Sequence, residues 1–474
     1  MELIIQISYL LAAVLFIFGL KQMSSPVTAR RGIHWAGAGM VVATLVTFAA
    51  EEITGNDQAA TNVMLIIVAI AIGGGYAWYT GKRVAMTDMP QMIAMYNGMG
   101  GGAAASIAAV ELVKAQAAVD AGAVSSIPAY LGSDVTVLAL VGAIIGTIAF
   151  SGSIIAWAKL DGRLNRSKLL PQQQLINLVL AVILVVVAVM AFNNSSLNTI
   201  IAFFGLALVL GIFITVPVGG ADMPVIISLF NALTGLAVGF EGYVLGNAAM
   251  IIAGTVVGAA GTLLTHLMAK AMNRSVSNVF FSGFGTETSA AAATETGGVQ
   301  KEIQPQDAGI MMAYASQVII VPGYGMAVAQ AQHKIWELTQ LLTNKGVTVK
   351  FAIHPVAGRM PGHMNVLLAE AGVPYDMIYD MEDINADFAN TTVTLVIGAN
   401  DVVNPAAKND PNSPLYGMPT LSAELSENVI VVKRGRGTGF SGVENPLFVA
   451  DNTRMLFGDG QKVANELIQA VKEL

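Results

Sequence analysis

The sequence predicts a polytopic α-helical membrane domain of about nine spans, followed by a soluble α/β domain with a doubly wound parallel sheet. Three observations support this division. Of the 474 residues, 54% are hydrophobic and 12% are charged, and the mean hydropathy of +0.64 is far too apolar for a soluble protein of this size. The apolar blocks lie before about residue 270, whereas residues 273–474 have the mixed composition of a soluble domain. In that second part, apolar runs alternate with helical patterns in βαβ order.

The first part contains apolar stretches that are each close to the roughly 20 residues required by a hydrocarbon core of about 30 Å. They lie near residues 4–20, 33–50, 61–80, 88–112, 133–158, 172–192, 198–217, 223–240 and 245–269. Glycine runs at 73–75 and 100–102 predict close packing between helices.

The charges of the connections predict the orientation in the membrane. Lysine and arginine gather in the first, third and fifth connections and after the last stretch, whereas the other connections carry mainly acids, including Glu241. Because positively charged connections stay inside, we expect the N-terminus outside and the C-terminal part in the cytoplasm. The predicted boundaries are a membrane domain at 1–272, a linker at 273–307 and a soluble domain at 308–474.

Two membrane segments share a pattern of Asp-Met-Pro, an isoleucine, and an aromatic residue followed by asparagine. One runs from Asp88 to Asn97 and the other from Asp222 to Asn231. Asp with proline two residues later is typical of a helix start, and nine residues at about 1.5 Å each place both asparagines some 13 Å deep. Such amides either bond a neighbouring helix or line a water path for a small ion. His266 in the last stretch favours the water path, unless it lies near enough to the interface to be simply hydrated.

A glycine pair after the first apolar run of the second part predicts a dinucleotide site. Residues 318–321 are typical of a buried strand, and Gly323 and Gly325 permit a tight turn in which the backbone approaches a pyrophosphate. The helix from Ala327 onward would point its first amides at the phosphates. Val328 stands where a third glycine usually allows close packing of helix on strand, so the motif is weak alone. Its βαβ context supports it.

The remaining elements complete a Rossmann-like order. We expect a helix from about residue 306, strands at 318–321, 347–353, 375–379, 393–397, 429–433 and 454–457, and helices at 326–344, 363–372, 383–389 and 461–473.

The residues after the strands indicate which dinucleotide is bound. An NAD site usually places an acid at the end of the second strand, but this strand is followed by His354. Lys433, Arg434 and Arg436 follow a later strand beside a glycine loop, and a 2′-phosphate requires such cations. The alternative is a solvated charged face. The loops 354–363 and 398–405 occupy two further strand ends and contribute Arg359 and Asp401 as polar groups.

Several strings in the sequence resemble one known family, the β subunit of proton-translocating NAD(P)+ transhydrogenase. In the soluble part they are P-G-Y-G-M-A-V-A-Q-A at 322–331, H-P-V-A-G-R-M-P-G-H-M-N-V-L-L-A-E-A at 354–371, V-P-Y-D at 373–376, I-G-A-N-D-V-V-N-P-A-A at 397–407, K-R at 433–434, N-P-L-F at 445–448 and M-L-F-G-D at 455–459. The resemblance extends to A-M-N-R-S at 271–275 and G-A-D-M-P at 220–224. Strings of this length are highly specific.

The resemblance implies that the soluble domain binds NADP(H) in a reversed orientation, and that the membrane part forms most of the proton-conducting domain. It implies that NAD(H) is bound by a separate α subunit, in a dimer of αβ units in the bacterial inner membrane, with no nucleic-acid partner. Together with the motif, it gives these expected NADP(H) contacts: Gly323, Tyr324, Gly325, Met326, Ala327, Val328, Val356, Ala357, Gly358, Arg359, Met360, Pro361, Gly362, Gly398, Ala399, Asn400, Asp401, Lys433, Arg434, Gly439, Phe440, Ser441, Gly442, Val443, Glu444, Asn445, Pro446 and Asp459.

For the proton path, the resemblance places Asn231 and Asp222 at positions tied to proton coupling. Asn97 departs from the family, because some members have a histidine there. Since asparagine cannot carry a proton, the titrating group is expected on the partner subunit or at His266. A membrane channel or transporter regulated by a nucleotide-sensing domain is the competing function. A quinone-linked or flavin dehydrogenase is less well supported, because one dinucleotide motif is present. The chain has no cysteine, and no metal site is expected.

Overall fold

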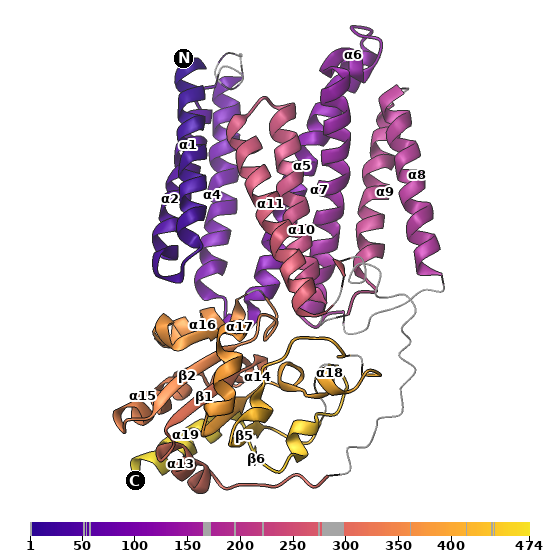
Figure 1. The fold of residues 1–474 in the computed structure, drawn as a ribbon. Coiled ribbons are helices and arrows are strands. Elements are labelled where there is room, and N and C mark those ends of the chain that lie inside the picture. The colour runs from indigo at the N-terminus through magenta and orange to yellow at the C-terminus, as the bar shows by residue number, and fades with distance from the viewer. Residues whose placement is uncertain are drawn as a thin grey trace. The chain divides into compact units, whose positions relative to one another are not determined.

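A computed structural model describes residues 2–50, 53, 55, 58–164, 172–193, 196–219, 222–273, 275–276, 298–360, 362–413, 415–437, 439 and 441–474 (Figure 1). They form two compact units. One comprises Met1–Gly220 and Val225–Thr265, and the other comprises Ala221–Pro224 and His266–Leu474. The first unit is helical, and the second carries the strands.

Long helices follow the predicted apolar stretches. They are α1 (Glu2–Met23), α2 (Pro26–Thr47), α4 (Ala59–Arg83), α5 (Met89–Asp120), α7 (Ser133–Leu160), α8 (Gln173–Asn193), α9 (Leu197–Thr215), α10 (Met223–Val244) and α11 (Ala248–Ala271). Within the described residues, eight of these are long and apolar enough to cross a membrane. The exception is α2, because Arg30, Arg31 and His34 occupy its first turns and shorten its apolar part. The predicted helical membrane domain is confirmed, with α2 as its least apolar member.

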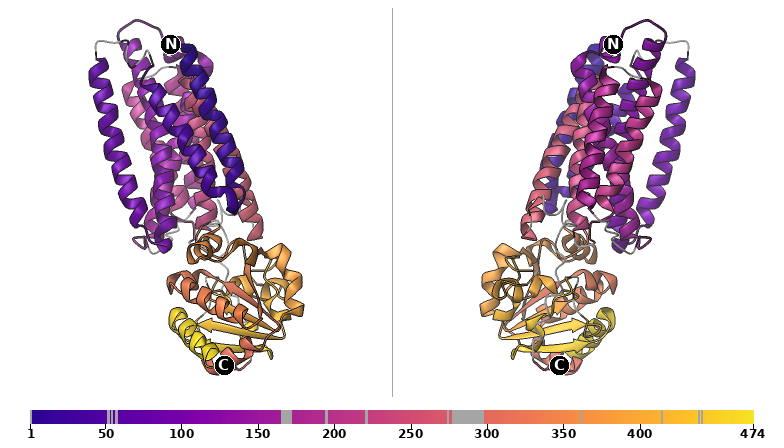
Figure 2. Two further views of the ribbon diagram at one scale, coloured as in Figure 1. Left: turned by 90° about the vertical axis from the view of Figure 1, so that its left-hand side faces the viewer. Right: turned by 90° about the vertical axis from the view of Figure 1, so that its right-hand side faces the viewer.

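Glycine allows α5 and α7 to approach closely, as predicted for the run at 100–102. A Cβ added at Gly101 of α5 would lie 2.8 Å from the Gly146 carbonyl oxygen of α7. A Cβ added at Gly146 would likewise lie 2.8 Å from the Gly101 carbonyl oxygen. The run at 73–75 on α4 differs, because a Cβ at any of its positions meets no described atom within 4 Å. Figure 2 shows α4 at the side of the helical unit. Packing within this chain is therefore the wrong explanation for the run at 73–75.

The second unit contains a six-stranded parallel sheet in the order β3-β2-β1-β4-β5-β6. The strands are β1 (Gln317–Pro322), β2 (Thr348–Ile353), β3 (Ile378–Asp380), β4 (Val393–Ile397), β5 (Asn428–Lys433) and β6 (Thr453–Phe457). The central strands β1, β4 and β5 bury almost every side chain, as expected for a sheet covered on both faces. The predicted doubly wound sheet is confirmed. Its order reverses between β1 and β4, where such folds bind ligands.

Short and long helices precede, connect and follow these strands. They are α13 (Pro305–Ala313), α14 (Tyr324–Val328), α15 (Gln332–Asn344), α16 (His363–Ala371), α17 (Met381–Ile384), α18 (Ala406–Asn409) and α19 (Gly460–Lys472). The C-terminal helix α19 packs against α13 and α15, and its apolar face, which includes Val463, Leu467 and Val471, is buried.

Two sequence-based elements need correction. The single helix predicted over 326–344 is wrong, because α14 ends at Val328 and the chain turns at Gln330, whose φ is 51°. The second helix then starts at Gln332. The strand predicted over 375–379 is also too long at its start. Pro374 precedes a 3-10 turn at Tyr375–Met377, and pairing with β2 begins at Ile378.

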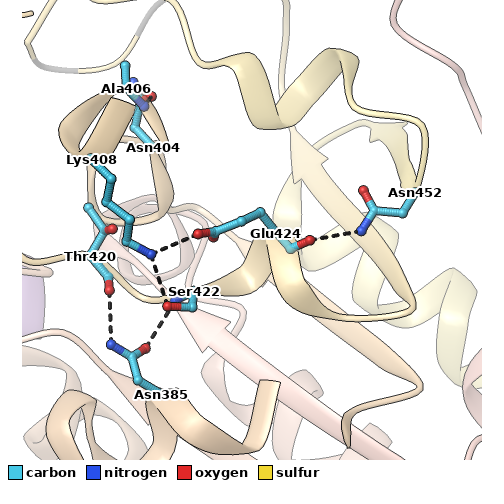
Figure 3. Close-up of polar contacts among 8 residues, drawn as sticks. All are labelled: Asn385, Asn404, Ala406, Lys408, Thr420, Ser422, Glu424 and Asn452. Atoms are coloured by element: carbon cyan, nitrogen blue, oxygen red, sulfur yellow. Dashed lines mark hydrogen bonds and ion pairs between the residues drawn. The ribbon is translucent and has the colours of Figure 1, made fainter. Parts of the chain in front are cut away.

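Side-chain contacts fasten the long connection between β4 and β5 (Figure 3). The Lys408 ammonium forms an ion pair of 2.7 Å with Glu424 and donates to the Ser422 hydroxyl at 3.0 Å. The Asn385 side chain donates to the Thr420 carbonyl at 3.1 Å and accepts from the Ser422 N–H at 3.0 Å. The connection that starts at the end of β4 is thereby held against the elements that follow β3.

Candidate nucleotide site

Two turns meet backbone to backbone at the carboxyl ends of β1 and β4. The Gly323 N–H donates to the Ile397 carbonyl at 2.9 Å, and the Gly325 N–H donates to the Gly398 carbonyl at 3.0 Å. A Cβ added at Gly323 would lie 2.6 Å from the Ala399 Cα, and one added at Gly325 would lie 2.7 Å from the Gly398 Cα. Gly398 also has a φ of 70°, a conformation that favours glycine. Only glycine therefore permits this close approach at the switch point.

A cleft of about 400 Å³ opens beside these turns. Gly325 and Gly398 line it together with Lys433, the last residue of the neighbouring strand β5, and the next residue, Arg434. The Lys433 ammonium donates to the Gly437 carbonyl and lies 4.6 Å from the centre of the Phe448 ring. Burial lowers the pKa of Lys433, and the Asp401 carboxylate acts in the opposite direction. Two of the three predicted cations, Lys433 and Arg434, thus share one cleft with the glycine turns, which suits an anionic ligand.

A second cleft, of about 420 Å³, shares Asn400, Lys433 and Gly437 with the first. Arg436, Phe448 and residues 298–300 also line it. The two clefts together extend from the glycine turns across the end of β5.

Side-chain hydrogen bonds join the turn after β4 to the glycine loop after β5. The Asp401 carboxylate accepts from the Ser441 N–H at 2.9 Å and from the Ser441 hydroxyl at 2.8 Å. The Asn445 amide donates to the carbonyl and side-chain oxygens of Asn400 at 3.1 and 3.0 Å. A Cβ added at Gly439 would lie 2.5 Å from Asp401 Oδ1. Asp401, predicted from its strand-end position, therefore fixes the loop and has no unbound oxygen in this arrangement.

A third group of side chains joins the turns after β1 and β2. The Arg359 guanidinium lies 4.3 Å from the centre of the Tyr324 ring. That ring makes an edge contact with the His363 ring, at 5.9 Å between centroids. The His363 Nδ1 atom accepts from the Arg359 backbone N–H at 3.1 Å. The structure thus brings together two predicted residues, Tyr324 and Arg359, through a histidine that the sequence did not single out.

His354 occupies the place where an NAD site usually has an acid. Its ring is buried, with Nδ1 accepting from the Val356 N–H at 3.2 Å and Nε2 lying 2.8 Å from the Pro419 carbonyl. Nε2 must then carry the proton and donate to Pro419. Burial lowers the pKa of His354 to about 4, against the opposing effect of the Pro419 carbonyl. His354 is thus a neutral residue that shapes the turn after β2.

The other predicted contacts lie around these turns. Gly362 has a φ of 65° and precedes α16. The Asp459 carboxylate caps α19 by accepting from the N–H groups of Gln461 and Lys462 at 3.1 and 3.3 Å. Ala357 and Met360 are buried, Glu444 lines the second cleft, and Pro446 starts a 3-10 turn. Pro361 and Phe440 lie outside the described residues.

In the helical unit, the two predicted asparagines have different surroundings. Asn97 of α5 is buried and donates to the Ser153 hydroxyl of α7 at 3.0 Å. Its side-chain oxygen accepts no hydrogen bond from a described residue. Asn231 is exposed on α10, and His266 is exposed on α11. Asp222 is buried immediately before α10. The structure therefore joins Asn97 to Ser153, and no described hydrogen bond joins it to Asn231.

Glu241 is a candidate that the sequence placed in a connection. In the structure, α10 continues to Val244, and the Glu241 side chain is 0% exposed. A Cβ added at Gly142 of α7 would lie 3.3 Å from the Glu241 carboxyl carbon. Its two oxygens accept no hydrogen bond from a described residue. The sequence analysis ended the apolar stretch at Phe240. Extending the predicted helix beyond that residue would have placed the Glu241 carboxyl group inside the helical unit.

Comparison with known proteins covers both units. A family model described as NAD(P) transhydrogenase beta subunit matches residues 5–470. Two relatives named NAD(P) transhydrogenase subunit beta, from Rhodospirillum rubrum and from a named strain of that species, are each 45% identical over 467 residues. Each alignment covers 98% of this chain and 98% of the relative. The similarity therefore includes the helical unit as well as the nucleotide turns.

Proposed function

Because this chain belongs to the NAD(P) transhydrogenase beta subunit family, we propose that its parallel-sheet domain binds NADP(H) and that its helical unit carries the coupled protons. The chain is a membrane protein and a component of the proton-translocating transhydrogenase enzyme. The observation that carries the assignment of NADP(H) is the cleft that Lys433 and Arg434 share with Gly325 and Gly398.

The cleft supports selection of a 2′-phosphorylated nucleotide. A phosphate offers several acceptor oxygens to an ammonium and a guanidinium group. The ribose 2′-hydroxyl of NAD(H) offers nothing comparable, and the acid that would recognise it is replaced by the buried His354. Glycine at 323, 325 and 439 lets the turns around the cleft pack against one another, because a Cβ there would collide with Gly398, Ala399, Asn400 or Asp401. We assign the other predicted contacts to the same nucleotide.

The partner of this chain is an α subunit, as the beta subunit name implies. We infer that this α subunit binds NAD(H), since one dinucleotide motif is present here and direct hydride transfer needs two nucleotides within about 3 to 3.5 Å of each other. When bound, NADP(H) supplies the nicotinamide that accepts or releases the hydride. The residues of this chain bind and orient it. We further propose a dimer of αβ units.

In the helical unit, we propose that Asn97 and Asn231 hold water in the proton route, with His266 and the partner subunit as sources of a titrating group. We propose that Asp222, which is buried immediately before α10, couples this route to the nucleotide. A proton and a nucleotide that bias one two-state element must influence each other reciprocally.

The orientation in the membrane follows from the charges of the connections. The proposal places the N-terminus outside and the sheet domain in the cytoplasm of a bacterial cell, with the chain in the inner membrane. The cations of the first connection, Lys21 and the nearby Arg30 and Arg31, and the cations Lys82 and Arg83 at the end of α4, support it.

The test is reconstitution of the chain with its α subunit in liposomes. NADPH formation from NADH should respond to an imposed pH gradient, and the purified chain should bind NADPH far more tightly than NADH. A rate that ignores the gradient would favour a nucleotide-sensing membrane protein. Equal affinity for the two nucleotides would remove the assignment of NADP(H) to this chain.

A further inference from the structure

His363 lies at the start of α16, next to the nucleotide turns but outside the predicted contacts. It is 2% exposed. Its Nδ1 atom accepts from the Arg359 backbone N–H at 3.1 Å, so the proton of the neutral ring must sit on Nε2. That Nε2 atom is buried and has no hydrogen-bond partner among the described residues. A ring held in one tautomer with a free buried donor is unusual, because buried polar atoms are normally bonded.

The position of His363 depends on a glycine. A Cβ added at Gly358 would lie 2.6 Å from the His363 Cβ and 3.0 Å from its Nδ1. The turn after β2 can therefore fold over the histidine only while residue 358 has no side chain. The edge contact with Tyr324, at 5.9 Å between ring centroids, places the same histidine against the turn after β1.

We propose that neutral His363 is a positioning residue for NADP(H), which holds the Arg359 turn to the Tyr324 turn and releases it when the ring is protonated. The inference rests on the proposed nucleotide site. Its chemical basis is that a protonated imidazole donates from both nitrogens, so Nδ1 can no longer accept from the Arg359 N–H. The turn then loses its hydrogen bond, and Arg359 and Tyr324 lose their shared anchor.

The surroundings favour the neutral ring in the folded protein. The titratable and charged groups described against it are Tyr324 from α14 and Arg359 from the turn after β2. Burial lowers the pKa of His363, and the Arg359 guanidinium lowers it further. The neutral, holding form is therefore present at neutral and alkaline pH. As the pH falls through the lowered pKa, the ring becomes protonated and nucleotide affinity should fall.

The test is NADPH and NADH binding to the full chain purified with its α subunit, measured by calorimetry from pH 8 to pH 5.5. His363→Gln removes the acceptor at the Nδ1 position, so NADPH binding at pH 8 should weaken about fivefold, as for one lost hydrogen bond. His363→Asn keeps an oxygen near the Nδ1 position and cannot titrate. It should restore most of the affinity at pH 8 and show a smaller loss on acidification than the wild type. The 2′-phosphate itself titrates in this range, and the comparison with His363→Asn removes that contribution.

A control variant and a stability measurement separate positioning from general destabilisation. His333 is exposed on α15, and His333→Asn should behave as the wild type at every pH. Thermal unfolding of each variant shows whether the fold is retained. Unchanged affinity in folded His363→Gln, or an acid response in His363→Asn equal to that of the wild type, overturns the inference. Failure of the wild type to prefer NADPH over NADH instead overturns the proposed nucleotide site.

Discussion

The strongest test of the nucleotide site is to remove the two cations at the end of β5, Lys433 and Arg434. Lys433 and Arg434 line the same cleft as the glycine turns, and we expect both to contact the 2′-phosphate. The variants are Lys433→Ala, Arg434→Ala and the double variant. NADH has no 2′-phosphate, so its affinity should change less than about twofold in each, within the usual effect of a surface substitution.

The two cations should contribute unequally to binding. Lys433 is half-buried, and the Gly437 carbonyl and the Phe448 ring fix its ammonium group. A hydrogen bond to a charged group contributes about 1.5 to 3 kcal/mol, so Lys433→Ala should weaken NADPH binding by about 10 to 150 fold. Arg434 is exposed, and an exposed ion pair contributes roughly 0.2 to 1 kcal/mol. Arg434→Ala should therefore weaken NADPH binding up to about fivefold.

The assay is calorimetric titration of NADPH and NADH into the purified chain at constant ionic strength. Lys462→Ala is the matched control, because its side chain is 76% exposed on α19, pairs with Glu466 at 3.8 Å and lines neither cleft. It should leave both affinities unchanged. Equal losses for NADPH and NADH in Lys433→Ala would show that this cation supports the fold of the loop and does not recognise the 2′-phosphate.

Three further predictions concern hydride transfer, the proton route and the stability of the fold. The chain without its α subunit should not transfer hydride from NADH to NADP+, and turnover by a preparation rigorously free of partner would contradict the two-subunit arrangement. Asn231→Leu should abolish gradient-driven NADPH formation while NADPH binding persists, and Asp222→Asn should change how NADP(H) affinity depends on pH; near wild-type proton-linked rates for Asn231→Leu would place the route elsewhere. His354 has a pKa lowered from 6.5 to about 4, so the folded state should lose stability as the pH falls below 6.5, by about 2 kcal/mol between pH 7 and pH 5. Chemical unfolding of the wild type and His354→Gln at both pH values would show this, and equal losses would refute it.

The parallel sheet could be predicted because its strands carry their own signal. Residues 318–321 and 393–397 are continuous buried runs followed by Gly323 and Gly398, and they pair in the structure as β1 and β4. The break after α14 gave no such signal, because Gln330 adopts a positive φ without being glycine. That break also explains Val328, whose side chain is 40% exposed at the end of α14. No third glycine is needed where the helix ends before it can pack closely on the strand.

Residues of the candidate site could be chosen from the sequence by residue type, but not by burial. Lys433 and Arg434 were chosen for charge at a strand end, and in the structure both line one cleft with Gly325 and Gly398. The sequence showed His363 only as a residue at the start of a helix. Its proposed role depends on the close packing of Gly358 against it and on the ring tautomer that accepts from the Arg359 N–H, and neither can be read from the sequence. Glu241 was assigned to a connection because the apolar run weakens at Phe240, although α10 continues past it.

The shortness of α14 has a consequence for how the nucleotide is held. A long helix after the first glycine turn presents about half a positive charge to a bound phosphate, through the sum of its aligned peptide dipoles. Here that helix has five residues, Tyr324–Val328, and the chain changes direction before the next helix. Much of the attraction for phosphate must then come from the side-chain charges of Lys433 and Arg434, and dissolved ions screen exposed charges over a Debye length of about 8 Å at physiological ionic strength. Nucleotide exchange in this subunit should therefore respond to salt concentration more strongly than exchange in a domain whose first helix is unbroken.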